Sequence, residues 1–371
     1  GVVEPVRVAG ALRADPVLAV RGVGVDELPI VESQPMIGPP PSPGGIRGEA
    51  DSFRVPASEN AATTLITGAL LAGARVHRLT GTDTSHLGSG KAGDFIVGDI
   101  SRDDLDTIAV RAGIMLTAEL ASPDLPSVPL RYPRVAVIQT WRGSATDAGW
   151  TRFVLGRHGL ETTVLRPADL RGRGVGNDFD AVIVASDSDR HLRDGLDPKH
   201  YPAEWAGGID EACLVALRAF GEGGGTVIGL GEAVGVVIEA FDLPISNVAA
   251  SLGKDLYAAP GAMVGFDIAT SHPLARGFAP TGQAMHVGPV VLDLKREEDD
   301  GLTVAARYRR GQPVLAGWMR GGRRLAGTPA VVESQTDGGR AILIAFRPQF
   351  RGQTPVSYRW LFNAIWRSVV P

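Results

Sequence analysis

The stretch from Ile209 to Asp242 limits the possible folds of this chain more than any other part of the sequence. A segment with the helical spacing of apolar residues (IDEACLVALRAF) leads through a glycine run at 223–225 into a continuous apolar run (TVIGL), and a second helical segment (VGVVIEAFD) follows. Parallel strands need a crossover connection, and a helix is the usual one. This order therefore predicts one strand of a parallel α/β sheet, with a helix before it and a helix after it.

The sequence before this stretch extends the same pattern. Apolar runs at 134–139, 161–165 and 179–186 are typical of buried strands, and a helix is expected from about 147 to 158, where Gly159 provides a C-terminal cap. The succession of strands and helices over 129–243 predicts an α/β fold. We expect a doubly wound, mostly parallel sheet of the flavodoxin or amidotransferase type.

The two flanking regions differ from this central domain. Residues 1–128 contain short strands and two helical segments, which predict a small α/β unit, and a proline-rich stretch at 34–45 reads as an extended arm. Residues 244–371 contain short apolar runs bounded by Gly, Asp and Pro, which predict an antiparallel β extension packed on the same domain. An amphipathic segment from Ser357 to Val369 is expected to close the chain as a helix.

Composition excludes several classes of function. With 371 residues the chain fits two or three domains, and its net charge of −4 offers no general attraction to nucleic acid or to anionic lipid. No apolar run approaches the length of about 20 residues that spans a bilayer. The single cysteine, Cys213, excludes an internal disulfide and a multi-thiolate metal site, and its place within a helical segment favours a buried thiol. Because the chain begins at Gly1, we expect a processed product or a piece of a longer protein.

Charged side chains follow several of the predicted strands. Arg142 and Asp147 come after the first strand of the central domain, Asp187 and Arg190 after the third, and Glu232 after the fourth. The carboxyl ends of parallel strands meet at one edge, so these five side chains could line one crevice and perform acid–base chemistry or hold a cation. The alternative is that their loops only cap helices and face water.

The turn from Gly229 to Gly235 allows three interpretations. A nucleophile elbow would carry Cys or Ser at this point, but the candidates here are Gly231 and Glu232, and neither performs acyl transfer. A dinucleotide-binding turn is the second, although the spacing is GxGxxxG rather than GxGxxG. The third is a tight turn that needs glycine for backbone reasons only, and we favour it.

Four polar side chains alternate along the segment that follows the last apolar run. Arg347, Gln349, Arg351 and Gln353 could bind a carboxylate through paired hydrogen bonds, or they could dock onto another domain. Ordinary structural pairing is the default interpretation of such a cluster.

Four stretches of the sequence together carry a resemblance to a known family. They are WRGSATDAGWTRFVL at 141–155, YPAEWAGGID at 201–210, LPISNV at 243–248, and GRAILIAFRPQFRGQT at 339–354 with YRWLFNA after it. These stretches resemble the region that follows the catalytic domain in large bacterial zinc carboxypeptidases of the carboxypeptidase A type, a region that looks like a class I glutamine amidotransferase-like domain with added segments. The resemblance covers nearly the whole chain.

This resemblance implies a secreted or periplasmic parent protein whose zinc and catalytic residues belong to a domain outside these residues. The one HxxE sequence here, His158 to Glu161, is interrupted by Gly159, so no metal site and no cofactor is expected in this chain. We expect a non-catalytic accessory region whose partner is the zinc carboxypeptidase domain of the same precursor or of a companion chain, or a peptide or cell-envelope ligand. The alternatives are an independent hydrolase that uses the acidic crevice, and nucleotide binding at 229–235.

Overall fold

The computed structural model describes residues 44–81, 91–118, 126–142, 145–296, 298–299 and 301–370. All of them belong to the compact unit Pro43–Pro371. Residues 1–43 of the predicted small α/β unit, which include the proline-rich arm except its last two residues, lie outside the described residues. In the part of the chain that is described, no helix combines the length and the apolar character needed to cross a membrane.

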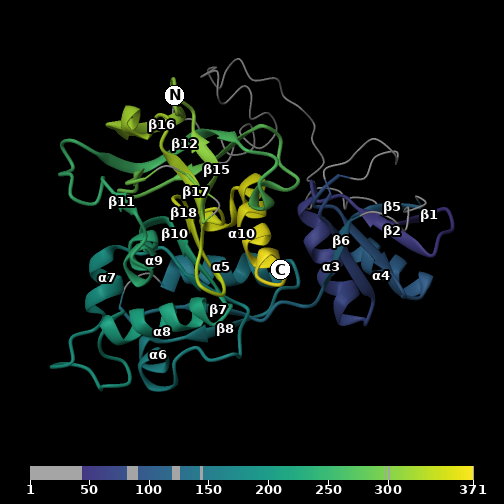
Figure 1. The fold of residues 1–371 in the computed structure, drawn as a ribbon, viewed down its shortest axis with the longest axis horizontal. Helices are drawn as coiled ribbons and strands as arrows, with labels where there is room; N and C mark the ends of the chain where they lie inside the picture. Colours follow the sequence, from purple (N-terminus) through teal and green to yellow (C-terminus); the bar gives the residue numbers. More distant parts are fainter. Residues whose placement is uncertain are drawn as a thin grey trace, which may run out of the picture. The chain divides into compact units, whose positions relative to one another are not determined.

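The largest sheet has ten strands, and half of it is parallel (Figure 1). Its parallel strands lie in the order β8-β7-β9-β10-β18, which is 2-1-3-4-5 in chain order and therefore the flavodoxin-like order. The prediction of a flavodoxin-type parallel sheet is confirmed for this half. The five strands are β7 (Val135–Ile138), β8 (Thr162–Leu165), β9 (Ala181–Val184), β10 (Thr226–Leu230) and β18 (Arg340–Ile344).

The fifth parallel strand corrects the sequence-based prediction. The run RAILIAF was assigned to the antiparallel extension, but β18 pairs in parallel with β10 on one side and antiparallel with β17 on the other. Four of its five residues are buried, because helices cover both faces of the sheet at this point. The C-terminal region therefore completes the central sheet, and the whole sheet is mixed rather than mostly parallel.

The antiparallel half continues from β18 without a break (Figure 1). Its strands follow in the order β17-β15-β12-β13, and β16 pairs with β12 beside β15. Two further strands, β11 and β14, form a separate two-stranded sheet. The strands of this region are β11 (Ile245–Asn247), β12 (Ala258–Ile268), β13 (Thr281–His286), β14 (Leu292–Leu294), β15 (Leu302–Tyr308), β16 (Val314–Arg320) and β17 (Pro329–Gln335).

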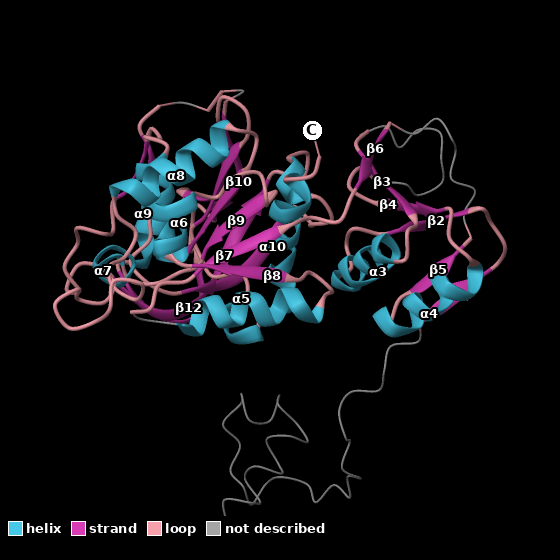
Figure 2. Cartoon of the chain, turned by 90° about the horizontal axis from the view of Figure 1, so that it is seen from below, coloured by secondary structure: helices cyan, strands magenta, loops and turns pink. Residues whose placement is uncertain are grey.

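Helices cover the two faces of the parallel half (Figure 2). Alternate residues of each strand point to opposite faces, so Val135 and Val137 of β7 belong to one hydrophobic cluster while Ala136 and Ile138 belong to the other. The helices on one face are α5 (Ala145–Arg157) and α10 (Pro355–Arg367); those on the other are α6 (Pro167–Arg173), α8 (Glu211–Glu222) and α9 (Val234–Ala240), and α7 (Asp189–Asp194) follows β9.

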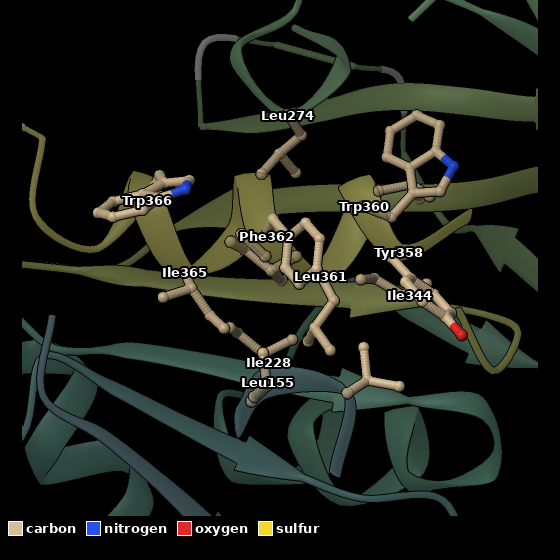
Figure 3. Packing of buried hydrophobic residues seen from close by; sticks show 14 of the residues in the cluster. Leu155, Ile228, Leu274, Ile344, Tyr358, Trp360, Leu361, Phe362, Ile365 and Trp366 are labelled. Carbon is tan, nitrogen blue, oxygen red and sulfur yellow. The ribbon is translucent and has the colours of Figure 1, made fainter. Parts of the chain in front are cut away.

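The closing helix α10 is a core element, as its amphipathic pattern predicts. Trp360 and Trp366 are each 1% exposed. Figure 3 shows Ile365 of α10 in the same cluster as Ile228 of β10 and Leu155 of α5. Burial of two tryptophans and several aliphatic side chains stabilises the fold by several kcal/mol, at roughly 1.5–3 kcal/mol for each large apolar side chain.

The first part of the described chain combines short strands with two helices, and we refer to these elements as the small α/β unit. A four-stranded antiparallel sheet in the order β2-β4-β3-β6 packs with two helices, and β1 pairs in parallel with β5. Ser101 caps the second helix by accepting a hydrogen bond from the Asp104 amide, and Gly113 ends it with a φ of 70°. The elements are β1 (Gly45–Arg47), β2 (Ser52–Val55), α3 (Asn60–Leu71), β3 (Arg75–Leu79), β4 (Phe95–Gly98), α4 (Arg102–Ala112), β5 (Met115–Thr117) and β6 (Ser127–Leu130).

Candidate functional site

The turn after β10 has the backbone of an elbow but carries no nucleophile. Gly231 follows the last residue of the strand with a φ of 53°, a region that glycine adopts without strain. A Cβ atom at this position would lie 2.4 Å from the Ser186 hydroxyl oxygen and 3.3 Å from Cγ of Arg347. Glycine is therefore required here both by the backbone and by the close approach of two neighbouring loops, as the preferred interpretation of the turn predicts.

The other two glycines of this turn have different roles. A Cβ atom on Gly229 would lie 2.9 Å from a methyl group of Val237 and 3.1 Å from the Cα atom of Val234, so the strand packs closely on α9 at this point. Gly235 has open space around its Cα atom, with nothing within 4 Å of a Cβ. The three glycines therefore do not form a shared cradle for a phosphate group.

Asp147 lies at the centre of a buried polar network that joins three loops. Its Oδ2 atom accepts hydrogen bonds from the Ser186 amide and from Nε2 of Gln349, both at 3.0 Å. The same amide nitrogen of Gln349 donates to the Thr151 hydroxyl at 2.8 Å. Burial raises the pKa of Asp147 to about 6, although Arg347 and these hydrogen bonds oppose the rise. The network fixes the start of α5 against the loops that follow β9 and β18.

Glu232 lies next to this network and pairs with Arg347. Its Oε1 atom is 3.6 Å from Nη2 of Arg347, and its backbone amide donates to the Ser186 hydroxyl at 3.2 Å. Gly288 approaches so closely that a Cβ atom there would lie 2.7 Å from the same Oε1 atom. Burial raises the pKa of Glu232; Arg347 opposes this rise, and Asp187 adds to it. The carboxylate is thus held between a cation and the loop after β13.

Asp187 forms a pair with a histidine that the sequence analysis did not select. Its Oδ1 atom accepts from the Ser188 amide at 2.7 Å and lies 2.9 Å from Nδ1 of His191. The spacing of four residues around the start of α7 is the signal that could have indicated this pair. In the described part of the chain, no hydroxyl or thiol is hydrogen-bonded to Nε2 of His191.

Only three of the five predicted crevice residues come together. Asp147, Asp187 and Glu232 are close enough for the charge of Asp187 to raise the pKa of both other carboxyls. The two arginines make other contacts. Arg190 lies on the outer side of α7, where it is 75% exposed and pairs with Asp194, and Arg142 donates to the Gly195 carbonyl. Arg190 thus faces solvent, and Arg142 is bonded to the residue that ends α7.

The structure also divides the predicted carboxylate-binding cluster at 347–353 into two pairs of side chains. Arg347 and Gln349 point into the buried network, whereas Arg351 and Gln353 are exposed to solvent. The left-handed backbone of Arg351, with a φ of 49°, redirects the chain between the two pairs. The four side chains therefore do not form one carboxylate-binding group.

The remaining titratable candidates have structural environments. Cys213 is fully buried in α8, and burial raises the pKa of its thiol to about 11. Nδ1 of His272 accepts a hydrogen bond from the Leu274 amide at 3.1 Å and caps a short turn. His158 packs on Phe362 with a ring separation of 4.7 Å. Within the described residues, no group of three or more His, Cys, Asp or Glu side chains is arranged to hold a metal ion.

Comparisons with known proteins add a distant likeness in fold. No family model matches the sequence, and no curated protein matches it. Similar solved structures include a glutamine amidotransferase from Thermotoga maritima, which is 9% identical, covers 64% of this chain and 96% of its own, and has a TM-score of 0.40. A cytoplasmic protein from Salmonella typhimurium LT2 is 12% identical and covers 64% of this chain and 99% of its own, with a TM-score of 0.41.

A third similar structure is a much longer enzyme. The β-galactosidase from Bacillus circulans sp. alkalophilus is 12% identical to this chain with a TM-score of 0.37, and the match covers 71% of this chain but only 34% of the β-galactosidase. At such low TM-scores and identities the likeness carries no argument about activity. The fold assignment depends on the strand order of the sheet itself.

Proposed function

We propose that this chain is a non-catalytic accessory region with an amidotransferase-like sheet, which binds or positions a partner instead of converting a substrate. The observation that carries this proposal is the glycine at the elbow with an arginine beside it. Acyl transfer needs a nucleophile and a neighbouring group that accepts its proton. Gly231 has no side chain, and the guanidinium of Arg347 offers only hydrogen-bond donors, so it does not supply the base.

The carboxylates around the elbow support the same conclusion. Asp147 is 3% exposed and already accepts two hydrogen bonds, and Glu232 pairs with Arg347 beneath Gly288. Groups that are engaged in this way stabilise the positions of loops. They have little freedom to exchange protons with a substrate.

The partner that we propose is a zinc carboxypeptidase domain of a secreted or periplasmic protein, present in the same precursor or in a companion chain. Sequence resemblance over 141–155 and 201–210 supports this choice. Each of the two stretches carries an exposed tryptophan, Trp141 at 44% and Trp205 at 46%, and their rings are 6.1 Å apart. Exposed tryptophans are frequent hot spots of protein interfaces, so we place the docking surface here.

One observation favours a second candidate function, an independent hydrolase that uses the acidic crevice. The pair of Asp187 and His191 is partly exposed, with 39% of the histidine side chain accessible, and it could accept a proton from a bound substrate or water. Nucleotide binding at the glycine turn has less support, because the Glu232 carboxylate already occupies the space beside Arg347.

The native protein provides the test of the accessory role. Intact-mass and zinc analysis of the protein purified from its source should find this chain continuous with, or bound to, a zinc-containing polypeptide that removes C-terminal residues from peptides. With the two parts produced separately, changing Trp141 and Trp205 to alanine should weaken their association at least tenfold, while the exposed Trp318, changed to alanine, serves as the control. A native species with the mass of this chain alone and no bound polypeptide contradicts the proposal.

A further inference from the structure

A cavity of about 800 Å³ lies away from the elbow, between the small α/β unit and the loop that follows β12. The lining comes from the loops around β2 and β4 and from the segment 270–279. The charged and hydroxyl-bearing residues of the lining are Arg54, Ser58, Lys91, Asp94, Thr270, Ser271 and Arg276.

The only carboxylate in the described lining is fully engaged by the protein. Oδ2 of Asp94 is 2.8 Å from Nη1 of Arg54 and accepts from the Lys91 amide at 3.0 Å, while Oδ1 accepts from the Ala57 amide at 2.9 Å. Three donors thus already share the charge of Asp94. The side chains of Lys91 and Arg276 form no ion pair with any described residue.

A further cation, Arg78, is buried close enough to Asp94 and Arg276 to feel their charges. Arg78 is 6% exposed, and its guanidinium donates to Oδ1 of Asn363 at 2.8 Å and to the Gly93 carbonyl at 3.4 Å. Both partners are neutral. Burial, together with the charges of Arg276 and Arg367, lowers the pKa of Arg78 to about 9, while Asp94 opposes this shift. A buried cation without a direct counterion is costly, and a nearby anion would reduce that cost.

The wall that carries Arg276 is closely packed. A Cβ atom on Gly93 would lie 2.5 Å from Cβ of Arg276, and one on Gly277 would lie 2.3 Å from the Ala57 carbonyl oxygen. Arg359 of α10 donates to the carbonyl oxygens of Gly277 and Ser58. The segment 270–279 is therefore held against the small α/β unit. This packing keeps Arg276 at the cavity before any ligand binds.

We propose that this cavity binds a small anion through phosphate or carboxylate oxygens, with Arg276 and Lys91 as the charged donors. The excess of cations, the engaged Asp94 and the buried Arg78 all favour a negative ligand. The hydroxyl groups of Ser58, Thr270 and Ser271 are suited to the polar remainder of such a molecule. The inference is independent of the accessory role, because it concerns a different face of the molecule and no residue of the elbow.

Calorimetric titration of the full chain with inorganic phosphate and, separately, with citrate tests this site. Each titration is run against sodium chloride at equal ionic strength. We expect saturable binding of at least one of the two probes, and the tighter one identifies the class of ligand. Arg276→Gln should weaken binding at least tenfold, and the exposed Arg190→Gln should leave it unchanged.

Thermal unfolding separates a ligand site from a merely structural role. Without a ligand, Arg276→Gln should unfold at the same or a higher temperature than the wild type, because it removes repulsion with Arg78. The stabilisation of the wild type by the better probe should be absent from the variant. If Arg276→Gln does not fold, Lys91→Gln takes its place. Absence of saturable binding by both probes, or equal binding by the cavity variant and by Arg190→Gln, overturns the proposal.

Discussion

Asp147 and Gln349 are 202 positions apart in the sequence, yet their side chains meet at 3.0 Å in the buried network at the edge of the sheet. This contact joins the helix after the first parallel strand to the loop after the last one. The contact stabilises the loops at the carboxyl ends of the parallel strands, which is where open α/β sheets usually bind their ligands.

Replacement of Asp147 by asparagine should change how stability depends on pH. Burial raises the pKa of Asp147 to about 6, above its value near 4 in an unfolded chain. The folded protein therefore favours the protonated carboxyl. The resulting contribution to the free energy of unfolding is complete below about pH 4 and is lost as the pH rises through about 6. The loss amounts to at most roughly 3 kcal/mol.

The Asp147→Asn variant has no carboxyl group at this position and should not lose stability in this way. Its stability relative to the wild type should therefore rise between pH 4 and pH 6 and stay constant above about pH 7. Urea unfolding at a series of pH values measures the difference. The exposed Asp189→Asn, at 79% side-chain exposure, is the control. Parallel stability curves for the wild type and the Asp147 variant would show that the carboxyl is not perturbed in the folded protein.

Gln349→Ala should destabilise the protein much more than Gln353→Ala, although the two residues are four positions apart. Gln349 is fully buried and donates to both Asp147 and Thr151, so its removal deletes one hydrogen bond to each of two buried side chains. We expect a loss of about 2–3 kcal/mol in the free energy of unfolding. Gln353 is exposed, and its replacement should cost less than about 0.5 kcal/mol. Similar losses for both variants would contradict the division of this segment into an inner and an outer pair.

Gly231→Ala and Gly235→Ala should change stability in opposite directions. At Gly231 the positive φ and the clash with the Ser186 hydroxyl should together cost about 2–4 kcal/mol. At Gly235, which lies in α9 with open space around it, alanine should stabilise by up to about 1 kcal/mol. Chemical denaturation measures both.

The same clash predicts a coupling between Gly231 and Ser186. In a Ser186→Gly background, the cost of Gly231→Ala should fall by at least about 1 kcal/mol, because the nearest atoms have been removed. Strictly additive effects in this double-mutant cycle would mean that the two positions are not in contact.

The fold could be predicted from sequence where periodicity and connection rules act together. The helix–strand–helix order around 226–230 predicts a parallel strand, because a parallel strand needs a crossover. The run at 340–344 could not be placed in the same way, because its apolar character suits either direction of pairing. Only tertiary packing between β10 and β17 decides that it completes the parallel half of the sheet.

The site was predictable to a similar extent. The position of a residue directly after a parallel strand indicates that it lies at the carboxyl edge, which is correct for Asp187 and Glu232. It does not determine the direction of the side chain, and so Arg190 was selected although its neighbour His191 contacts Asp187. The inward turn of Gln349 and the outward turn of Gln353 depend on the backbone at Arg351, whose left-handed conformation the sequence does not indicate.

The most direct test of the non-catalytic role is a measurement of turnover by the full chain on glutamine, on short peptides and on an activated ester. The comparison variant carries Asp187→Asn and Glu232→Gln together, and Asp189→Asn is the control. The account predicts that the wild type and both variants hydrolyse none of these substrates faster than buffer does. Hydrolysis by the wild type that the double variant abolishes and Asp189→Asn retains would contradict it.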